Sequence, residues 1–476
     1  MKKRILSMLL VLVMAISTLA ACGGPSSNKT ANFEVPEGGY DGSKVTIKFY
    51  HTMGANLREV LDLYIAEFNK LYPNIEIKHD QVGSYDDVRT TIATELTAGE
   101  EPNIAYCYPD HVAMYNISKS VVTLDNLIAS TQEVKRADGS TEVLGLTQAQ
   151  IDDFIAGYYN EGKSFGDELM YTLPLSKSTE VLYYNKTYFT ENNISVPTTW
   201  DELEQVCKKI LEIETAKGEK CIPLGYDSEA NWFITMCEQL GTDYTSATGD
   251  HYLFDNADNH AFVKKFRDWY QNGLLTTQTL YGAYTSGLFV NQDPTAATSY
   301  MSIGSSAGAT HQRPTKGEDG NYPFEVGITT IPQADASNPK VISQGPSLCI
   351  FQKSNPQEVV ASWLFVKYLT TNVEFQAEFS MASGYVPVLK SVADNEVYKE
   401  FLNSADGGNN IAALSAKICM EQEKAYYTSP AFNGSSTARD EVGALLTKCL
   451  SAQTDNVDQL IKDAFAEAIE ECEYNE

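Results

Sequence analysis

Cysteine and histidine often carry metal-binding or nucleophilic chemistry, and the chain holds nine cysteines and six histidines. No two cysteines stand in a C-x-x-C spacing and the histidines are scattered singly, so we expect no metal site. No H-E-x-x-H segment occurs. Acidic residues are abundant, but no spacing singles out the facing pair of carboxylates that a glycoside hydrolase needs. The sequence therefore predicts a protein that is not an enzyme and that uses no cofactor.

The turns after three predicted strands are better candidates for a binding site. Apolar residues from position 45 to 108 follow a β-α-β-α-β order, with strands at 45–50, 75–83 and 104–108 and helices between them. This order predicts a largely parallel sheet, and ligands bind outside the carboxyl ends of such strands. The turns at His51, Tyr85 and Tyr108–Asp110 lie there. His51 is better explained as a residue bonded within its own turn.

The rest of the chain mixes strands and helices, which indicates an α/β fold. Thr199 and Glu202 form a capping box that begins a helix. The pattern from 224 to 275 is mainly helical, and Gly384 breaks a later run of helices. Strands are expected at 181–186 and 324–331, an apolar stretch at 341–351, and helices at 356–371, 373–382, 439–450 and 457–469.

The N-terminus has the pattern of an export signal. Basic residues at 2–4 precede an apolar run at 5–16, which is shorter than the roughly 20 residues of a membrane span. This pattern predicts a signal peptide over 1–21, with an uncleaved anchor as the alternative. The ending Leu-Ala-Ala-Cys resembles the lipobox of bacterial lipoproteins, which implies a diacylglycerol on Cys22.

Residues 22–42 are rich in Gly, Ser, Pro and Asn and predict a flexible tether, with a packed extension as the alternative. We therefore expect an extracellular chain, lipid-anchored at the outer face of the cell membrane.

Composition limits the partners. The 476 residues are 43% hydrophobic, which is enough for two domains, and no later stretch approaches the length of a membrane span. The net charge of −28 disfavours nucleic acids and anionic lipids as partners. Apart from Cys22, the cysteines lie mostly in apolar runs, so buried free thiols are favoured over disulfides.

Several stretches resemble the extracellular solute-binding proteins of ABC importers. They are FNKLYPNIEI, TAGEEPNIAYCY, LPLSKSTEVLYYNKTYF, VPTTWDELEQVCKKI and SGYVPV, in the family's order. The resemblance implies two α/β lobes joined by hinge strands, with the ligand in the cleft between them. It implies a first lobe of residues 43–175 plus 334–375 and a second lobe of residues 176–333 plus 376–476.

Within that family the chain looks most like the glycerol-3-phosphate-binding members. The resemblance implies that their ligand contacts fall on Tyr85, Ser178, Ser305, Gly345, Tyr385 and Arg439 of this sequence. One position departs from their pattern, because Pro109 stands where they carry Glu after the residue that matches Tyr108. Asp110 is then the candidate to replace that Glu. The stretch after Asn291 also lacks an expected Gly.

The chemistry of these residues suits a phosphate ester. The Arg439 guanidinium is a planar fork for oxyanions, hydroxyls and a Gly backbone N–H can complete the cage, and Asp110 can accept bonds from ligand hydroxyls. Arg439 could instead be an ordinary surface residue, Tyr385 a core residue, and Ser305 a helix cap. Trp232 is a further candidate that could stack on a sugar, whereas Trp200 and Trp269 fit a core better.

We therefore expect a monomeric receptor that captures a polyol phosphate, sn-glycerol 3-phosphate or its diester, by lobe closure and delivers it to an ABC permease. A receptor for a neutral mono- or oligosaccharide is the alternative. A secreted glycoside hydrolase and a structural surface lipoprotein are alternatives of other classes.

Overall fold

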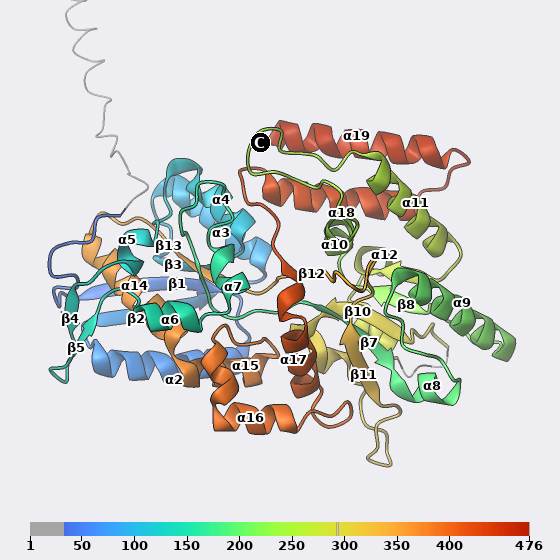
Figure 1. Cartoon of the computed structure of the whole chain (residues 1–476), viewed down its shortest axis with the longest axis horizontal. Coiled ribbons are helices and arrows are strands. Elements are labelled where there is room, and N and C mark those ends of the chain that lie inside the picture. Colours follow the sequence, from blue (N-terminus) through green and yellow to red (C-terminus); the bar gives the residue numbers. More distant parts are fainter. Residues whose placement is uncertain (1–32, 292, 294, 476) are drawn as a thin grey trace, which may run out of the picture.

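The computed structural model describes residues 33–291, 293 and 295–475, which form two lobes side by side (Figure 1). The first lobe is built on a five-stranded sheet in the order β2-β1-β3-β13-β6. Its strands are β1 (Val45–His51), β2 (Ile75–Gln81), β3 (Ile104–Cys107), β6 (Leu173–Pro174) and β13 (Ser347–Ile350). Strand β1 pairs in parallel with β2 and β3, whereas β13 runs antiparallel to β3 and β6.

The predicted β-α-β-α-β order at the start of the first lobe is confirmed. Helix α2 (Ala55–Leu71) connects β1 to β2, and helix α3 (Tyr85–Ala98) connects β2 to β3. Ser84 caps α3 with a capping box, and Gly99 ends it at φ 72°. Helices α14 (Pro356–Thr371) and α15 (Val373–Ser383) return to this lobe, where α14 contacts β1 and α15 contacts α2.

The second lobe has its own five-stranded sheet, in the order β11-β7-β10-β8-β9. Its strands are β7 (Glu180–Asn185), β8 (Leu224–Tyr226), β9 (Leu275–Thr277), β10 (Met301–Ser305) and β11 (Val326–Thr330). Sequence analysis predicted β7 and β11 but not the central strand β10, which reads Met-Ser-Ile-Gly-Ser. Only Met301 and Ile303 of this short strand are apolar, and its last residues run into a small polar stretch that was not interpreted as a strand.

Long helices cover the second sheet. They are α9 (Trp200–Lys217), α10 (Glu229–Leu240), α11 (Ala257–Gln271), α18 (Ser435–Ser451) and α19 (Val457–Asn475). Thr199 caps α9 by the predicted capping box with Glu202. The rings of Trp200 and Trp269 are buried in this lobe's core, as predicted.

The chain passes between the lobes along several segments that form a hinge. Backbone bridges join Lys177 to Val386 and Ser178 to Gln344. Nearby, β12 (Val341–Ile342) pairs in parallel with β14 (Tyr426–Tyr427). Sequence reasoning treated 341–351 as one apolar stretch, whereas the structure divides it at Gly345 into β12 and β13.

Shorter elements complete the molecule. They are α4 (Pro109–Tyr115), η1 (Asn116–Ser118), α5 (Asp125–Ile128), β4 (Glu133–Lys135), β5 (Thr141–Val143), α6 (Gln148–Asp153), α7 (Ala156–Glu161), α8 (Lys186–Glu191), α12 (Gln278–Tyr281), α13 (Ser286–Phe289), η2 (Ser306–Gln312), η3 (Lys390–Asp394), α16 (Glu396–Asn403), α17 (Ile411–Glu421) and η4 (Glu423–Ala425). The predicted lobe boundaries stay a prediction, and α15, which that prediction splits at 375/376, packs on α2 of the first lobe.

The end of the predicted tether differs from expectation. Phe33 and Tyr40 are buried, the Tyr40 ring lies edge-on to Tyr72, and Asn126 Nδ2 donates to the Phe33 carbonyl at 3.0 Å. Residues 33–42 are therefore packed on the first lobe, because two aromatic rings find apolar cover there. The predicted signal peptide, Cys22 and the start of the tether lie outside the described residues.

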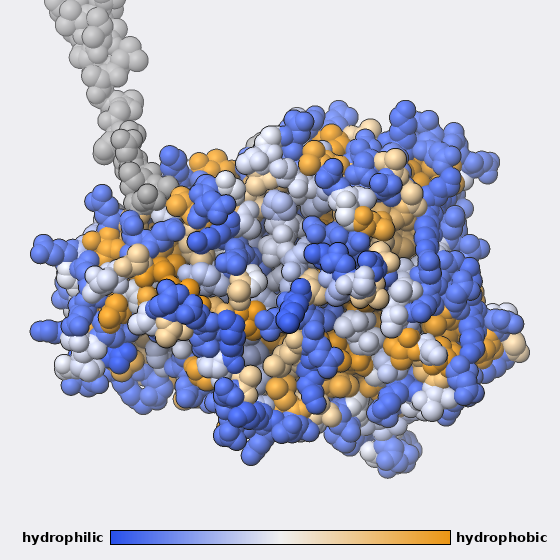
Figure 2. All heavy atoms as spheres, in the orientation of Figure 1, coloured by the Kyte–Doolittle hydropathy of each residue, from blue (hydrophilic) through white to orange (hydrophobic). Residues whose placement is uncertain are grey.

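The surface and the cysteines fit the composition. Hydrophilic side chains cover most of the face shown in Figure 2, with small apolar patches between them. The eight cysteines of the described region are free thiols, and all but Cys221 are buried. Among the described residues, no helix is both long and apolar enough to cross a membrane.

Candidate ligand-binding site

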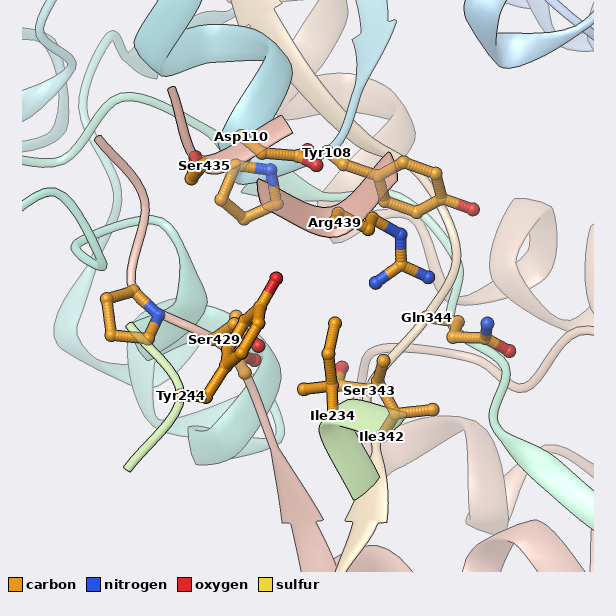
Figure 3. Close-up of a pocket in the computed structure, with 13 residues that line it drawn as sticks. Tyr108, Asp110, Ile234, Tyr244, Ile342, Ser343, Gln344, Ser429, Ser435 and Arg439 are labelled. Carbon is orange, nitrogen blue, oxygen red and sulfur yellow. The ribbon is translucent and has the colours of Figure 1, made fainter. Parts of the chain in front are cut away.

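A cavity of about 100 Å³ lies where the two lobes meet the hinge (Figure 3). The first lobe contributes the turn from Tyr108 to Asp110, which starts helix α4. The second lobe contributes Ile234 and Tyr244, together with Ser435 and Arg439 of helix α18. The hinge contributes two segments, 342–344 and 428–430. Both lobes and the hinge thus share one small site.

Among the described residues that line this cavity, Arg439 is the one that carries a guanidinium. Its Nη2 donates a hydrogen bond to Asn231 Oδ1, and Asn231 Nδ2 donates to Glu180 Oε1 at 2.9 Å. Among the described residues, no carboxylate forms an ion pair with this guanidinium. Figure 3 shows it pointing into the cavity. Four of its five N–H donors remain for an oxyanion.

Glu180 holds Arg439 in place from behind without competing for it directly. The carboxyl is fully buried, and Tyr226 donates its hydroxyl to Oε2 at 2.7 Å. Burial raises the pKa of Glu180 from 4.5 to about 7, although the bonds from Tyr226 and Asn231 and the charge of Arg439 oppose the shift. Asn231 therefore stands between a carboxyl whose charged form is disfavoured by burial and a cation that faces the cavity.

Polar atoms without partners line the same cavity. The Tyr244 hydroxyl, Gln344 Oε1 and the Ser429 hydroxyl are buried and lack a hydrogen bond within the described residues. Buried polar atoms are almost always paired in folded proteins. Figure 3 shows the Tyr244 hydroxyl directed toward the centre of the cavity. These atoms indicate a site for a small ligand that is rich in oxygen.

Asp110 supplies a carboxylate to the wall of the same cavity. Its carboxylate accepts the backbone N–H of His111 at 2.9 Å. Burial lowers the pKa of His111, so this imidazole stays neutral near pH 7. Asp110 can therefore accept hydrogen bonds from ligand hydroxyls.

A cluster of four tyrosines adjoins the cavity through the ring of Tyr108. Tyr85 stacks on Tyr108 with ring centroids 4.6 Å apart, and Tyr106 stacks on Tyr85 at 6.3 Å. Burial raises the pKa of Tyr85, and the neighbouring Tyr385 adds to this shift. The hydroxyls of Tyr85 and Tyr106 have no hydrogen-bond partner in the region described. The cluster therefore extends the set of free hydroxyls beyond the cavity wall.

A buried ion pair supports the hinge wall of the cavity. Lys177 and Glu161 are both almost fully buried, and Lys177 Nζ also donates to the Gly345 carbonyl at 3.2 Å. The other oxygen of Glu161 accepts the hydroxyls of Ser343 at 3.0 Å and Thr428 at 3.2 Å. Ser343 and Thr428 line the cavity, so Glu161 of the ion pair holds two wall residues in place by hydrogen bonds.

Asp110 and Arg439 are the two predicted residues that line the cavity. Tyr85 and Tyr385 lie in the adjoining tyrosine cluster. Ser178 is buried one layer behind the wall, where its backbone N–H donates to the Gln344 carbonyl at 2.8 Å.

Three other predicted residues do not line the cavity. The Ser305 hydroxyl caps η2 by accepting the N–H of Ala307 at 3.3 Å, as the alternative interpretation expected. Gly345 has φ 97°, and a Cβ there would lie 2.5 Å from the Ser176 carbonyl oxygen, so it allows two hinge segments to pack closely. Trp232 is fully buried, with ring centroids 4.9 Å from Tyr226 and 4.0 Å from Phe266. It is a core residue because α10 turns it toward the second sheet.

Two matches to catalytic patterns escaped the sequence analysis, and the structure argues against both. Residues 304–308 read G-x-S-x-G after strand β10, but the Ser306 hydroxyl is fully buried and accepts the N–H of Thr179 at 3.2 Å. Residues 157–164 match the spacing of a P-loop, yet their first half lies within helix α7. A P-loop needs a glycine-rich loop between a strand and a helix.

Most of the other wall residues carry no sequence signal that marks them as part of a site. Tyr108 belongs to a turn that topology marked as a candidate, but Tyr244, Ser343, Gln344, Thr428, Ser429 and Ser435 were not predicted. Several of them lie on loops or hinge segments. Their type is common, and only the folded chain brings them together.

A family model described as bacterial extracellular solute-binding protein matches residues 64–403. The chain belongs to this family. This solute-binding protein is therefore a binding protein and not an enzyme, which confirms the prediction.

Relatives with assigned ligands include two types. A multiple sugar-binding protein from Streptococcus mutans is 23% identical over 72% of this chain and 76% of its own length. An sn-glycerol-3-phosphate-binding periplasmic protein, UgpB, from Salmonella typhimurium is 25% identical over 72% of this chain and 74% of its own length.

Solved structures confirm the two-lobed fold of this solute-binding protein. UgpB from Mycobacterium tuberculosis, solved with glycerophosphocholine, aligns with a TM-score of 0.69 at 17% identity, covering 91% of this chain and 98% of that one. The cyclic alpha-maltosyl-1,6-maltose binding protein from Arthrobacter globiformis aligns with a TM-score of 0.66 at 18% identity, covering 91% and 100%.

Proposed function

We propose that this solute-binding protein captures a small polyol phosphate, sn-glycerol 3-phosphate or its diester, for an ABC importer. The observation that carries the proposal is Arg439, whose guanidinium faces a cavity between the lobes and is tied to an amide. The phosphoryl group would bind Arg439 together with the free hydroxyls of Tyr244 and Ser429. The polyol end would donate its hydroxyls to Asp110.

The size of the cavity supports a small ligand. Its volume of about 100 Å³ corresponds to about three water molecules at roughly 30 Å³ each, so it has room for a small polar ligand group and not for an oligosaccharide. An oligosaccharide would require a wider separation of the lobes. The similarity to the UgpB protein of Salmonella typhimurium, named as an sn-glycerol-3-phosphate-binding protein, also supports the proposal.

A neutral sugar is the second candidate, because the Streptococcus mutans relative is named as a multiple sugar-binding protein. Under that proposal Asp110 and the tyrosine cluster would bind the sugar hydroxyls and its apolar face. Arg439 would then contribute little to affinity.

The proposal also includes the setting of the protein. Cleavage before Cys22 and lipidation of its thiol would hold the mature chain, as a monomer, at the outer face of the cell membrane. The lobes, predicted as residues 43–175 plus 334–375 and 176–333 plus 376–476, would close on the ligand and present it to the permease subunits.

Calorimetric titration of the chain that follows Cys22 tests the choice of ligand. We expect saturable binding of sn-glycerol 3-phosphate or glycerophosphocholine, and no measurable binding of glycerol, which lacks the anion. Tight binding of a neutral mono- or oligosaccharide, with none of either phosphate, would replace the first candidate by the second.

A further inference from the structure

Arg89 on helix α3 connects the first lobe directly to helix α18 of the second lobe. Its Nη1 donates a hydrogen bond to the Ser436 hydroxyl. Nη1 and Nη2 also lie 3.4 and 3.5 Å from Asp440 Oδ2. The Arg89 side chain is only 18% exposed, although Asp440 is largely open to solvent. In Figure 1, α3 and α18 face each other across the gap between the lobes.

Helix α18 carries these contacts and the cavity residues on adjacent faces. Ser435 and Arg439 line the cavity and are four residues apart, so they lie on one face of the helix. Ser436 and Asp440 each follow by one residue, which is a rotation of about 100° around the axis. One helix therefore offers the cation to the ligand and a hydroxyl and carboxylate to the opposite lobe.

Arg89 also has an alternative partner on its own helix. Asp86 lies three residues earlier, with its Oδ1 3.3 Å from Arg89 Nη2. When the lobes separate, Arg89 loses Ser436 and Asp440 but keeps Asp86. In the open form the guanidinium would then remain paired with Asp86 and hydrated. Breaking its contact with the second lobe would therefore cost little free energy.

We propose that Arg89, Ser436 and Asp440 form a latch that favours the closed form without touching the ligand, and so set its affinity and release rate. The proposal rests on lobe closure, as in the proposed function. A contact made only in the closed form increases the closed population, and apparent affinity rises with the fraction of protein that is competent to bind tightly. The latch residues are positioning residues.

The test compares Asp440→Asn with Asp86→Asn. Each substitution neutralises one acid beside Arg89, but only Asp440 lies on the other lobe. We expect Asp440→Asn and Arg89→Gln to weaken binding of sn-glycerol 3-phosphate about 2- to 10-fold, mainly through faster dissociation. Asp86→Asn should leave affinity unchanged or increase it. In the double variant Arg89→Gln/Asp440→Asn, the loss should be no larger than in Arg89→Gln alone.

Small-angle scattering of the ligand-free full chain provides a readout that does not depend on the ligand. We expect a larger radius of gyration for Arg89→Gln than for the wild type, and expansion of the wild type when salt is raised about tenfold, because exposed charges are screened. Arg89→Gln should not respond to salt in this way. Thermal unfolding checks that each variant is folded.

The outcomes separate the latch from the proposed function. Equal effects of Asp440→Asn and Asp86→Asn on affinity, or no change in ligand-free size for Arg89→Gln, would overturn the latch. If no phosphate ester binds at all, the proposed ligand is wrong, and the scattering comparison still decides the latch.

Discussion

At the scale of single residues, the site depends on how charge is distributed behind Arg439. A fully ionised carboxylate in direct contact would neutralise the guanidinium and weaken its attraction for an anion. Asn231 stands between Arg439 and Glu180 instead, and burial disfavours the charged form of Glu180. The arrangement orients the cation and leaves most of its charge to the cavity.

The raised pKa of Glu180 predicts a particular pH dependence of stability. Between pH 4.5 and about 7 the unfolded chain loses this proton while the folded protein keeps it, so the free energy of unfolding should fall as pH rises. The full change is on the order of 3 kcal/mol for a shift of this size. Glu180→Gln removes the titration, so its stability relative to wild type should increase from pH 5 to pH 7.5.

Urea unfolding of both proteins at several pH values measures this difference, in which the contributions of other groups cancel. A difference that is constant over this pH range would show that Glu180 ionises normally in the folded protein.

Lys177 offers a second test at the residue scale. Replacing it by Met leaves Glu161 buried without its cation, and we expect a loss of about 3–5 kcal/mol in the free energy of unfolding. Ligand affinity should fall as well, because Glu161 positions Ser343 and Thr428 in the wall.

Lys186→Met is the matched control for Lys177→Met. Lys186 pairs with Glu325 on the surface, with the two side chains 49% and 47% exposed, so we expect a change of less than about 1 kcal/mol. Equal losses in the two variants would contradict the special role of the buried pair.

At the scale of elements, the hinge depends on a close approach between chain segments. Gly345 combines φ 97° with a backbone neighbour at 2.5 Å from the position of a Cβ. Gly345→Ala should therefore lower the free energy of unfolding by roughly 2–4 kcal/mol, as strain and a backbone clash add. Differential scanning calorimetry measures the change.

Gly218 provides the control, because it has φ 79° at the end of α9 but nothing within 4 Å of a Cβ. Gly218→Ala should lower the free energy of unfolding by only about 1 kcal/mol, because only the left-handed backbone conformation is unfavourable for alanine there. Similar losses at both positions would mean that the close approach at Gly345 is unimportant.

The elements also show what sequence can predict. Strands β1, β2 and β7 and the helices α2, α3 and α9 have clear periodicity and caps, and their positions were predicted well. Strands β8 and β10 were missed because they have only three and five residues and each contains a glycine, Gly225 and Gly304, which weakens a local strand pattern. Such strands are specified by packing and not by a local pattern.

The candidate site shows the same contrast between residues marked by a local signal and residues brought together only by the fold. Asp110 and Arg439 line the cavity. Chemistry and the resemblance both suggested Arg439, whereas Asp110 was predicted as a replacement for the Glu that the family pattern carries. Ser305, Gly345 and Trp232 were placed in the site by resemblance or type and lie outside the cavity wall. Tyr244 and Ser429 were missed since their approach to Arg439 depends on the tertiary fold.

At the scale of the whole molecule, charge opposes the proposed ligand during its approach. The net charge of −28 repels a phosphate ester at long range, while Arg439 attracts it only within the cavity. We expect the association rate of sn-glycerol 3-phosphate to rise when ionic strength is raised from about 0.01 M to 0.15 M, because screening shortens the range of the repulsion from about 30 Å to 8 Å. Stopped-flow tryptophan fluorescence measures the rate. A fall with salt would indicate that a local positive field dominates the approach.

The central claim is that the Arg439 guanidinium binds the charged end of a small hydroxylated ligand between the two lobes. The most direct measurement is the calorimetric affinity of sn-glycerol 3-phosphate for wild type, Arg439→Lys and Arg439→Gln. We predict a loss of at least about 2 kcal/mol for Arg439→Gln and a smaller loss for Arg439→Lys, which keeps the charge but not the planar fork. Unchanged affinity in a folded Arg439→Gln variant would contradict the claim.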